Sequence, residues 1–307
     1  MRRAGRRRVL IVEQEQSPGV HSSGRNAAIV RDVMVEGMIA PLLRAGADVL
    51  RSGDLARYDS CGLYLAGAGD EPIERRFPIA AGAGAWEPSC GVIDAAGLLD
   101  AYLHGAAVEY NLRIESFERR GDRIRVATNR GEMTCNLLVN AAGPWAGRLG
   151  GLPLQPLNRT LFCTPPIERI DPHWPVVWHV EDGLYFRPES GGLLLSVCEE
   201  HPAEPGDYTE DPARLEELAA KLERLQPNLA DIAVRTQWVG QRTFAPDRNF
   251  VIGFDPREPL VFHVAGLGGH GVTSSFAVGH LAADLILAGP EAASSRPNPY
   301  DPQRLLS

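Results

Sequence analysis

A short apolar run that stops at an acid constrains this chain more than any other feature. Val9–Val12 is apolar and mostly β-branched, and Glu13 follows it directly. This pattern is typical of a buried parallel strand whose carboxyl end reaches a ligand crevice, where an acid commonly holds ribose hydroxyls. The next segment, His21–Ala28, combines small residues, hydroxyls and one guanidinium, so its donors can approach a phosphate or a ring. Together these residues predict part of a nucleotide site.

The residues before this strand predict that a unit of the nucleotide site is missing. Arg2–Arg7 has the features of a helix end, because basic residues suit the negative end of the helix dipole and Gly5 suits its termination. In a dinucleotide-binding fold, a strand and a glycine-rich turn come before that helix. We therefore expect upstream codons or a partner to supply them.

Composition limits the classes of protein to which the chain can belong. With 307 residues and 44% hydrophobic content, it can bury a sizeable core and is expected to form two domains. A net charge of -8 argues against general nucleic-acid binding. The five cysteines are widely spaced without a C-x-x-C pair, which predicts a reduced, cytoplasmic protein without a structural metal. No apolar run reaches about 18 residues, so no membrane span is expected.

Helices and strands are predicted along the rest of the chain. A helix is expected around Val35–Val49, a second follows the capping residue Asp94, and a third follows Asp211 and Pro212. Strands without intervening helices indicate an antiparallel sheet. The segments expected as strands are Gly62–Leu65, Ile124–Thr128, Glu132–Cys135, Leu137–Asn140, Val176–His179, Gly183–Arg187, Leu193–Ser196, Ile232–Val239 and Leu260–Val264.

A second glycine-rich segment, Gly266–Gly271, fits G-x-G-x-x-G literally. It follows an expected strand and precedes a helix expected over Thr273–Leu287. A nicotinamide site of this kind needs a second strand that ends in an acid about 20 residues later, whereas the chain offers only Asp284 within the helix. A nicotinamide-dependent dehydrogenase is therefore kept as an alternative.

Seven segments in chain order resemble FAD-dependent amine and amino-acid oxidoreductases of the D-amino-acid oxidase, glycine oxidase and sarcosine oxidase type. Proteins of the D-arginine dehydrogenase type are the most similar. The resemblance implies an α/β fold in which a truncated Rossmann-like FAD-binding domain is interleaved with an antiparallel-sheet substrate domain. It places residues 1–60, 91–157 and 240–307 in the first domain and residues 61–90 and 158–239 in the second. The matching segments are VLIVEQE, HSSGRNAA, CGVID, LLVNAAGPWA, LYFRPESGGLLLS, QRTFAPDRNFVIG and AGLGGHG.

The resemblance also implies roles for individual residues. Arg242 would hold the substrate carboxylate through two parallel hydrogen bonds. Tyr185, Arg159 and His270 would line the substrate pocket. The turn at Gly266–Gly271 would direct a helix N-terminus at the flavin edge that becomes negative on reduction. The residues expected at the cofactor are Glu13, Ser22, Ser23, Gly24, Arg25, Asn26, Ala27, Ala142, Gly143, Gly268, Gly269, His270, Gly271 and Val272.

The implied reaction is FAD-dependent oxidation of an amine or amino acid, expected to be a D-amino acid, to an imine by hydride transfer to the flavin. Ile29, Arg31 and Met34 align where the D-arginine dehydrogenase pattern has a histidine, a threonine and a tyrosine, which disfavours arginine as the substrate. A further alternative is a non-catalytic or partner-dependent relic of the fold. Because the nucleotide site is expected to be incomplete, we also expect weak FAD binding and self-association or a partner subunit.

Overall fold

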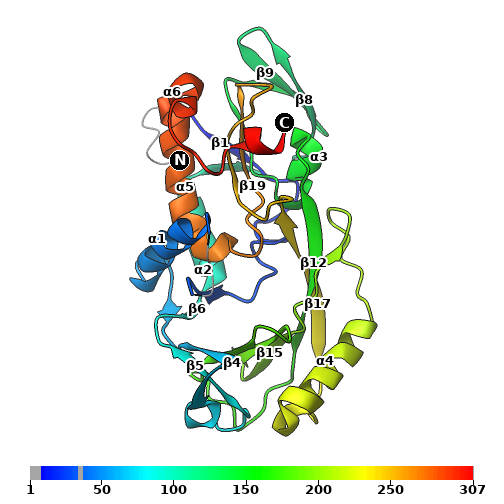
Figure 1. Ribbon diagram of the computed structural model, residues 1–307. Helices are drawn as coiled ribbons and strands as arrows, with labels where there is room; N and C mark the ends of the chain where they lie inside the picture. The colour runs from blue at the N-terminus through cyan, green and yellow to red at the C-terminus, as the bar shows by residue number, and fades with distance from the viewer. Residues whose placement is uncertain (1–7, 34–36, 307) are drawn as a thin grey trace.

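The computed structural model describes residues 8–33 and 37–306, and Met34 and Val35 lie outside this part. Figure 1 shows an elongated molecule with small sheets and helices at one end and a large sheet at the other. Two long strands, β12 (Gln155–Cys163) and β17 (Thr236–Phe244), run from one end toward the other. The two strands pair antiparallel along their whole length.

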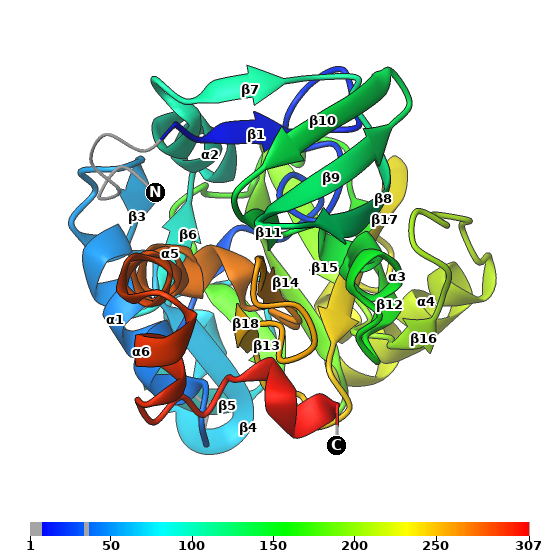
Figure 2. The ribbon, with the colours of Figure 1, turned by 90° about the horizontal axis from the view of Figure 1, so that it is seen from above.

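Two separate small sheets form the end that carries the chain's first strand. β1 (Leu10–Val12) pairs in parallel with β7 (Ala107–Glu109), and the two lie side by side in Figure 2. β11 (Leu138–Asn140), β19 (Val261–Ala265) and β18 (Val251–Phe254) form the other sheet, with β11 parallel to β19. In the described part of the chain no strand connects β1 to β11, so each keeps one unpaired edge.

β1 is less buried than its apolar run alone predicts. Leu10 is 44% exposed, and Ile11 and Val12 are only partly buried. A parallel strand is buried when neighbours cover both of its edges and both of its faces. Among the described residues β1 has a strand neighbour on one edge only, which accounts for the exposure.

Helices and a third small sheet complete this end. β2 (Ile29–Val30), β6 (Gly91–Ile93) and β3 (Tyr58–Asp59) form the sheet. The helix expected from about residue 35 is α1 (Ala40–Arg51), which packs against α5 (Gly271–Ala288). Asp94 caps α2 as predicted, since its carboxylate accepts from the Gly97 N–H at 2.9 Å. The remaining elements are α2 (Ala95–Leu103), η3 (Gly143–Trp145), α3 (Ala146–Gly150), α6 (Pro290–Ser294) and η5 (Pro302–Leu305).

The strands expected at Ile124–Thr128 and Glu132–Cys135 are present and form a hairpin. β9 (Arg123–Thr128) and β10 (Gly131–Cys135) pair antiparallel, and β8 (Ile114–Arg120) adds a third strand. Ile124 and Val126 point from β9 into a small core with Leu138 and Val261. The hairpin is therefore fixed to the β11–β19 sheet by apolar packing.

A buried carboxylate links β18 to β19. Asp255 follows β18 and accepts hydrogen bonds from Arg257 Nη2 at 2.6 Å and from His263 Nε2 at 3.0 Å. Burial raises the pKa of Asp255, but the hydrogen bonds from Arg257 and His263 outweigh burial, and the net pKa lies well below its usual range. The charged carboxylate therefore stabilises this corner of the fold.

The large sheet is antiparallel except at one pair of strands. β13 (Val176–His179) pairs in parallel with β4 (Leu63–Pro72), whereas its other neighbour, β14 (Leu184–Glu189), is antiparallel. The strand expected from Ile232 begins only at Thr236, because Ile232 and Val234 pack into the apolar core instead of joining a ladder. The remaining elements here are η2 (Ile73–Arg75), β5 (Ala83–Glu87), β15 (Gly192–Ser196), β16 (His201–Pro202), α4 (Ala213–Leu225) and η4 (Pro227–Leu229).

Alternation along the strands gives the large sheet two different faces. One face carries Phe162, Phe186 and Leu195, and it packs against Leu218 and Leu222 of α4. Asp211 accepts from the Ala213 N–H at 3.0 Å, and α4 begins at Ala213, one residue later than expected. The opposite face carries a second apolar cluster and faces the loop that ends at β2. The members of this cluster are Ala27, Leu161, Cys163, Tyr185 and Leu194, with Ile29, Trp178, Cys198 and Trp238 at its edge.

The helix α5 is long and apolar enough to cross a membrane by length and composition alone, a test that core helices of soluble proteins also pass. It packs against α1, β18 and β19. Gly46 of α1 allows close approach of the two helices, since a Cβ there would lie 2.1 Å from the Thr273 carbonyl oxygen. These contacts indicate a core helix.

Candidate active site

Three arginine side chains approach one another between the large sheet and the N-terminus of α5. Arg159 belongs to β12, Arg242 to β17, and Arg31 follows β2. Burial, with a smaller contribution from the positive charges of Arg242 and Arg159, lowers the pKa of Arg31 to about 10. Burial, followed by the charge of Arg242, also lowers the pKa of Arg159. Since an arginine is protonated at neutral pH even after such a shift, this region is strongly electropositive.

Two aromatic side chains of the sheet face lie beside these arginines. Tyr185 is opposite Trp178 in the β13–β14 ladder, and their ring centroids are 6.2 Å apart in an edge-to-face arrangement. Arg31 Cζ lies 4.1 Å from the centroid of the Trp178 ring. The aromatic pair therefore extends the arginine region across the sheet.

Several buried polar atoms in this region lack a hydrogen-bond partner within the described residues. They include Arg242 Nη1, Trp178 Nε1 and Tyr185 Oη. An unpaired buried donor costs about 1–3 kcal/mol, so such donors are rare in folded proteins. Three of them in one region indicate a place where a ligand with acceptor atoms binds.

His270 lies at the junction between this region and α5. Burial lowers its pKa to about 3, and the positive charges of Arg31, Arg242 and Arg248 act in the same direction. His270 is therefore a neutral imidazole at pH 7, which can donate one hydrogen bond and accept another. Its position next to the arginines favours binding of an anion over binding of a cation.

The glycine turn brings the N-terminus of α5 against Arg242. Gly268 and Gly269 have φ values of +52° and +82°, a conformation that favours glycine. A Cβ on Gly269 would lie 2.6 Å from Arg242 Cδ and Nε, so only glycine allows this approach. No side chain caps α5, and its first N–H groups have no partner within the helix. Gly271 and Val272 are the first two residues of this electropositive helix end.

The loop after β1 is tied to β17 by its own side chains. Ser22 Oγ donates to the Gln241 carbonyl at 2.7 Å, and Arg25 Nη1 donates to the Val239 carbonyl at 3.0 Å. Asn26 Oδ1 accepts from the Ala28 N–H at 2.8 Å. These contacts fix the loop, and they leave the backbone of Ser23 and Gly24 exposed. In the same loop the Ala27 carbonyl accepts from Arg187 Nε at 2.8 Å.

The remaining residues expected at the cofactor lie at the ends of β1 and β11. Glu13 follows β1, and its Oε1 accepts from the Glu15 N–H at 3.0 Å. Ala142 follows β11 and donates its N–H to Asn140 Oδ1 at 3.3 Å. Gly143 has a φ of +52°, and an added Cβ there would meet no atom within 4 Å. The residues after β1 and β11 therefore carry polar groups or, at Gly143, backbone with free space beside it.

These residues fit the two ends of FAD. The Glu13 carboxylate suits ribose hydroxyls, and the uncapped N-terminus of α5 suits the pyrimidine edge of the flavin. The turn that binds the pyrophosphate in a dinucleotide fold is not among the described residues. Within these residues β1 and β11 belong to separate sheets. The nicotinamide alternative loses support, because within the described residues α5 leads into α6 and η5 rather than into a second parallel strand.

Trp178 was not identified from the sequence as a site residue. It alternates with Val177, which is fully buried on the opposite face, and this alternation is the signal that could have shown it. Arg31 was noted only as a departure from a pattern. Its packing against Trp178 joins residues 147 positions apart in the chain, which no local pattern reveals.

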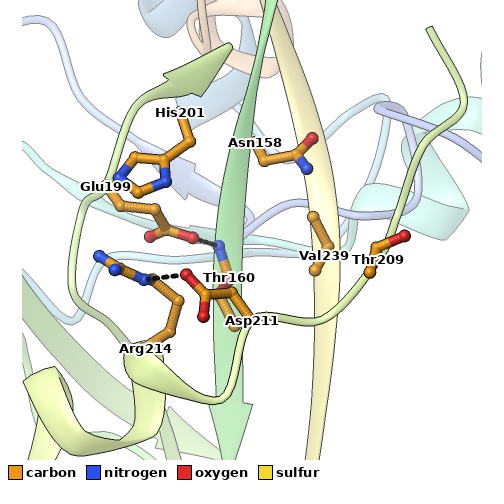
Figure 3. Close-up of a pocket in the computed structure, with 8 residues that line it drawn as sticks. All are labelled: Asn158, Thr160, Glu199, His201, Thr209, Asp211, Arg214 and Val239. Carbon is orange, nitrogen blue, oxygen red and sulfur yellow. Dashed lines mark hydrogen bonds and ion pairs between the residues drawn. The ribbon is translucent and has the colours of Figure 1, made fainter. Parts of the chain in front are cut away.

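Figure 3 shows a separate small cavity of about 40 Å³ on the other side of β12. Thr160 and Glu199 line it and are joined by a hydrogen bond, and Arg214 pairs with Asp211 at its edge. Arg159 alternates with Thr160 and therefore points away from this cavity. None of the residues expected at the substrate or the cofactor lines it.

Comparisons with known proteins agree with this architecture. The model of the family described as "FAD dependent oxidoreductase" matches residues 64–285. The chain is 28% identical over 229 residues to monomeric sarcosine oxidase of Bacillus sp. (strain B-0618), covering 66% of this chain and 58% of that protein. It is 26% identical over 198 residues to glycine oxidase of Bacillus subtilis, covering 61% of this chain and 51% of that protein.

A solved structure shows the same fold. L-proline dehydrogenase from P. horikoshii superimposes with a TM-score of 0.82 at 21% identity, covering 97% of this chain and 91% of that one. The matches to the two curated oxidases span less than two thirds of the length of each. Since the family model covers most of the chain and the α/β architecture agrees, the chain belongs to the family of FAD-dependent oxidoreductases that includes sarcosine oxidase and glycine oxidase.

Proposed function

We propose that this protein oxidises an amino acid at the carbon next to its nitrogen, with FAD as the electron acceptor. The observation that carries the proposal is Arg242, whose buried Nη1 has no partner within the described residues and whose side chain lies against the turn that begins α5. A guanidinium in this place can bind a carboxylate through two parallel hydrogen bonds. The substrate would then be fixed beside the helix N-terminus.

The residues of this chain supply position and charge. Arg242 binds the carboxylate and so orients the Cα–H bond, while Tyr185 and Trp178 offer further donors to acceptor atoms of the substrate. Neutral His270 and the N-terminus of α5 favour negative charge nearby. FAD, when bound, would supply the two-electron acceptor for the hydride lost from Cα. The substrate nitrogen gives up a proton, and water then adds to the resulting imine to release a keto acid and ammonia.

The finer proposal is that the substrate is a D-amino acid. It rests on the resemblance of LYFRPESGGLLLS and QRTFAPDRNFVIG to the D-arginine dehydrogenase type. The mitochondrial dimethylglycine dehydrogenase of Rattus norvegicus is also similar, at 28% identity over 238 residues, so secondary amines belong in the same test. Arginine is not the proposed substrate, because a cation would be repelled by Arg31, Arg159 and Arg242.

The test is anaerobic reduction of the FAD-loaded protein by single amino acids. Bleaching of the flavin absorbance by one enantiomer, together with formation of the matching keto acid, is the expected result. Arg242→Met should slow bleaching at low substrate concentration. If dithionite bleaches the flavin but no D-amino acid, L-amino acid or N-methyl amino acid does, the proposal is wrong.

We also propose a cytoplasmic location. All five cysteines are free, as expected for a reducing compartment. Fractionation of the source cells tests this, and recovery of the protein from an oxidising compartment would contradict it.

A further inference from the structure

Arg31 has a role that binding of a single carboxylate does not explain. Its guanidinium lies over Trp178, and its Nη1 donates to the Val33 carbonyl at 3.1 Å. Its backbone N–H lies 3.4 Å from Thr273 Oγ1 in the first turn of α5. Arg31 is therefore held between the sheet face and the helix N-terminus, on the same side as Tyr185.

The charges of the three arginines are not balanced by this part of the protein. Arg159 Nη2 lies 3.3 Å from Glu200 Oε1, and the same carboxylate also accepts from Arg248 at 2.9 Å. Within the described residues, neither Arg31 nor Arg242 forms an ion pair with a carboxylate. One acid is thus shared by two arginines, while two further arginines have none.

Nearby thiols do not supply the missing negative charge. Cys90 and Cys198 are the groups whose charge would favour the protonated form of Arg31. Burial raises the pKa of Cys90 to about 11 and also raises the pKa of Cys198, so both thiols are neutral at pH 7. Burying a charge without a counter-charge is costly, which favours an anion from outside the described residues as the group that completes the site.

The α-carboxylate of a substrate on Arg242 accounts for one of the two arginines. We propose that the substrate carries a second carboxylate that Arg31 binds, so that the protein acts on an acidic amino acid or another amine with two carboxylates. Here Arg242 and Arg31 hold the two ends of one substrate, and Trp178 and Tyr185 line the space between them. This inference rests on the proposed function and specifies its substrate class.

The test uses two five-carbon acids that differ in one carboxylate. Binding of glutarate and of pentanoate is measured by calorimetry with the full chain, its Arg31→Met and Arg242→Met variants, and the control Arg224→Met. Arg224 is suited as a control because its side chain is 59% exposed and pairs with Asp182 on the surface. Turnover of D-glutamate and D-leucine is measured with the same proteins after loading with FAD.

The wild type should bind glutarate at least tenfold more tightly than pentanoate. Arg31→Met should weaken glutarate binding about 30-fold or more, which is the lower end of the range for loss of one partner of a buried charge pair. The affinity for pentanoate should change by less than about twofold. Arg242→Met should weaken both acids, and Arg224→Met neither. Arg31→Lys keeps the charge and should retain part of the preference for glutarate, and the wild-type comparison stands even if Arg31→Met does not fold.

The second carboxylate and the proposed function are overturned by different outcomes. If the wild type bound both acids with equal affinity and Arg242→Met weakened binding of both, the proposal that the substrate carries a second carboxylate would be wrong. The proposed function would not be contradicted. The same conclusion would follow if Arg31→Met weakened both acids equally. Absence of binding of either acid, together with absence of flavin reduction by any amino acid, would overturn the proposed function as well.

Discussion

Replacing Arg242 with methionine should have opposite effects on ligand binding and on stability. The Arg242 side chain lies against Gly269, and its Nη1 is buried without a partner within the described residues. In the absence of ligand, a buried unpaired donor costs about 1–3 kcal/mol. Arg242→Met removes this cost and keeps a side chain of similar length, so the free energy of unfolding should rise by up to about that amount.

Carboxylate binding should change in the other direction. Removing one partner of a buried charge pair costs about 2–5 kcal/mol, which corresponds to a loss of affinity of about 30-fold to several thousand-fold. The assays are urea denaturation of the ligand-free protein and calorimetric titration with pentanoate. Arg224→Met serves as the matched control, because an exposed ion pair contributes only about 0–1 kcal/mol to stability.

A structural role for Arg242 would give a different pattern of results. If Arg242→Met lowered the free energy of unfolding by more than about 1 kcal/mol and left pentanoate affinity unchanged, the side chain would stabilise the fold rather than bind a ligand. A uniform loss of both stability and affinity would indicate collapse of the turn at Gly269. Only increased or unchanged stability with lost affinity supports the reasoning.

Two further predictions concern stability. Gly46→Ala should destabilise the protein by about 1–3 kcal/mol in urea denaturation, because its Cβ would meet the Thr273 carbonyl, whereas Gly279→Ala in open space on α5 should be neutral or stabilise by up to about 1 kcal/mol. Asp255→Asn should lower the free energy of unfolding most above about pH 4. A carboxylate whose pKa is depressed in the folded state stabilises the fold above its unfolded pKa, and this stabilisation is lost as the pH falls through the folded pKa. Equal losses of stability at pH 7 and pH 2 would contradict this prediction.

Local signals predicted local structure well. The cap at Asp94 and the strands expected at Ile124–Thr128 and Glu132–Cys135 both depend on residues a few positions apart, and the structure contains both features. The aliphatic and aromatic residues of the strand expected over Gly183–Arg187 were enough to place Tyr185 on a strand. These features are fixed by short-range geometry, which a sequence shows directly.

Features that depend on distant partners were not predictable in the same way. The exposure of Leu10 depends on which strands lie beside β1, and the apolar run itself contains no information about them. Ile232 is β-branched, which is typical of strand residues, yet it packs into the core beside α4. The position of Arg31 over Trp178 likewise depends on how β2 lies against the large sheet. Tertiary packing decided each of these cases.

The candidate site depends on the register of a single ladder. In the β12–β17 pair, Leu157 is opposite Arg242 and Arg159 is opposite Gly240. A shift of one residue would move Arg242 to the other face of the sheet, away from Gly269 and the N-terminus of α5. Gly240 fixes the register against the loop after β1, because a Cβ there would lie 2.5 Å from the Arg25 carbonyl oxygen, while Arg25 itself donates to Val239. The loop expected at the cofactor and the arginine expected at the substrate are therefore aligned by the same strand, so a change that alters one should displace the other.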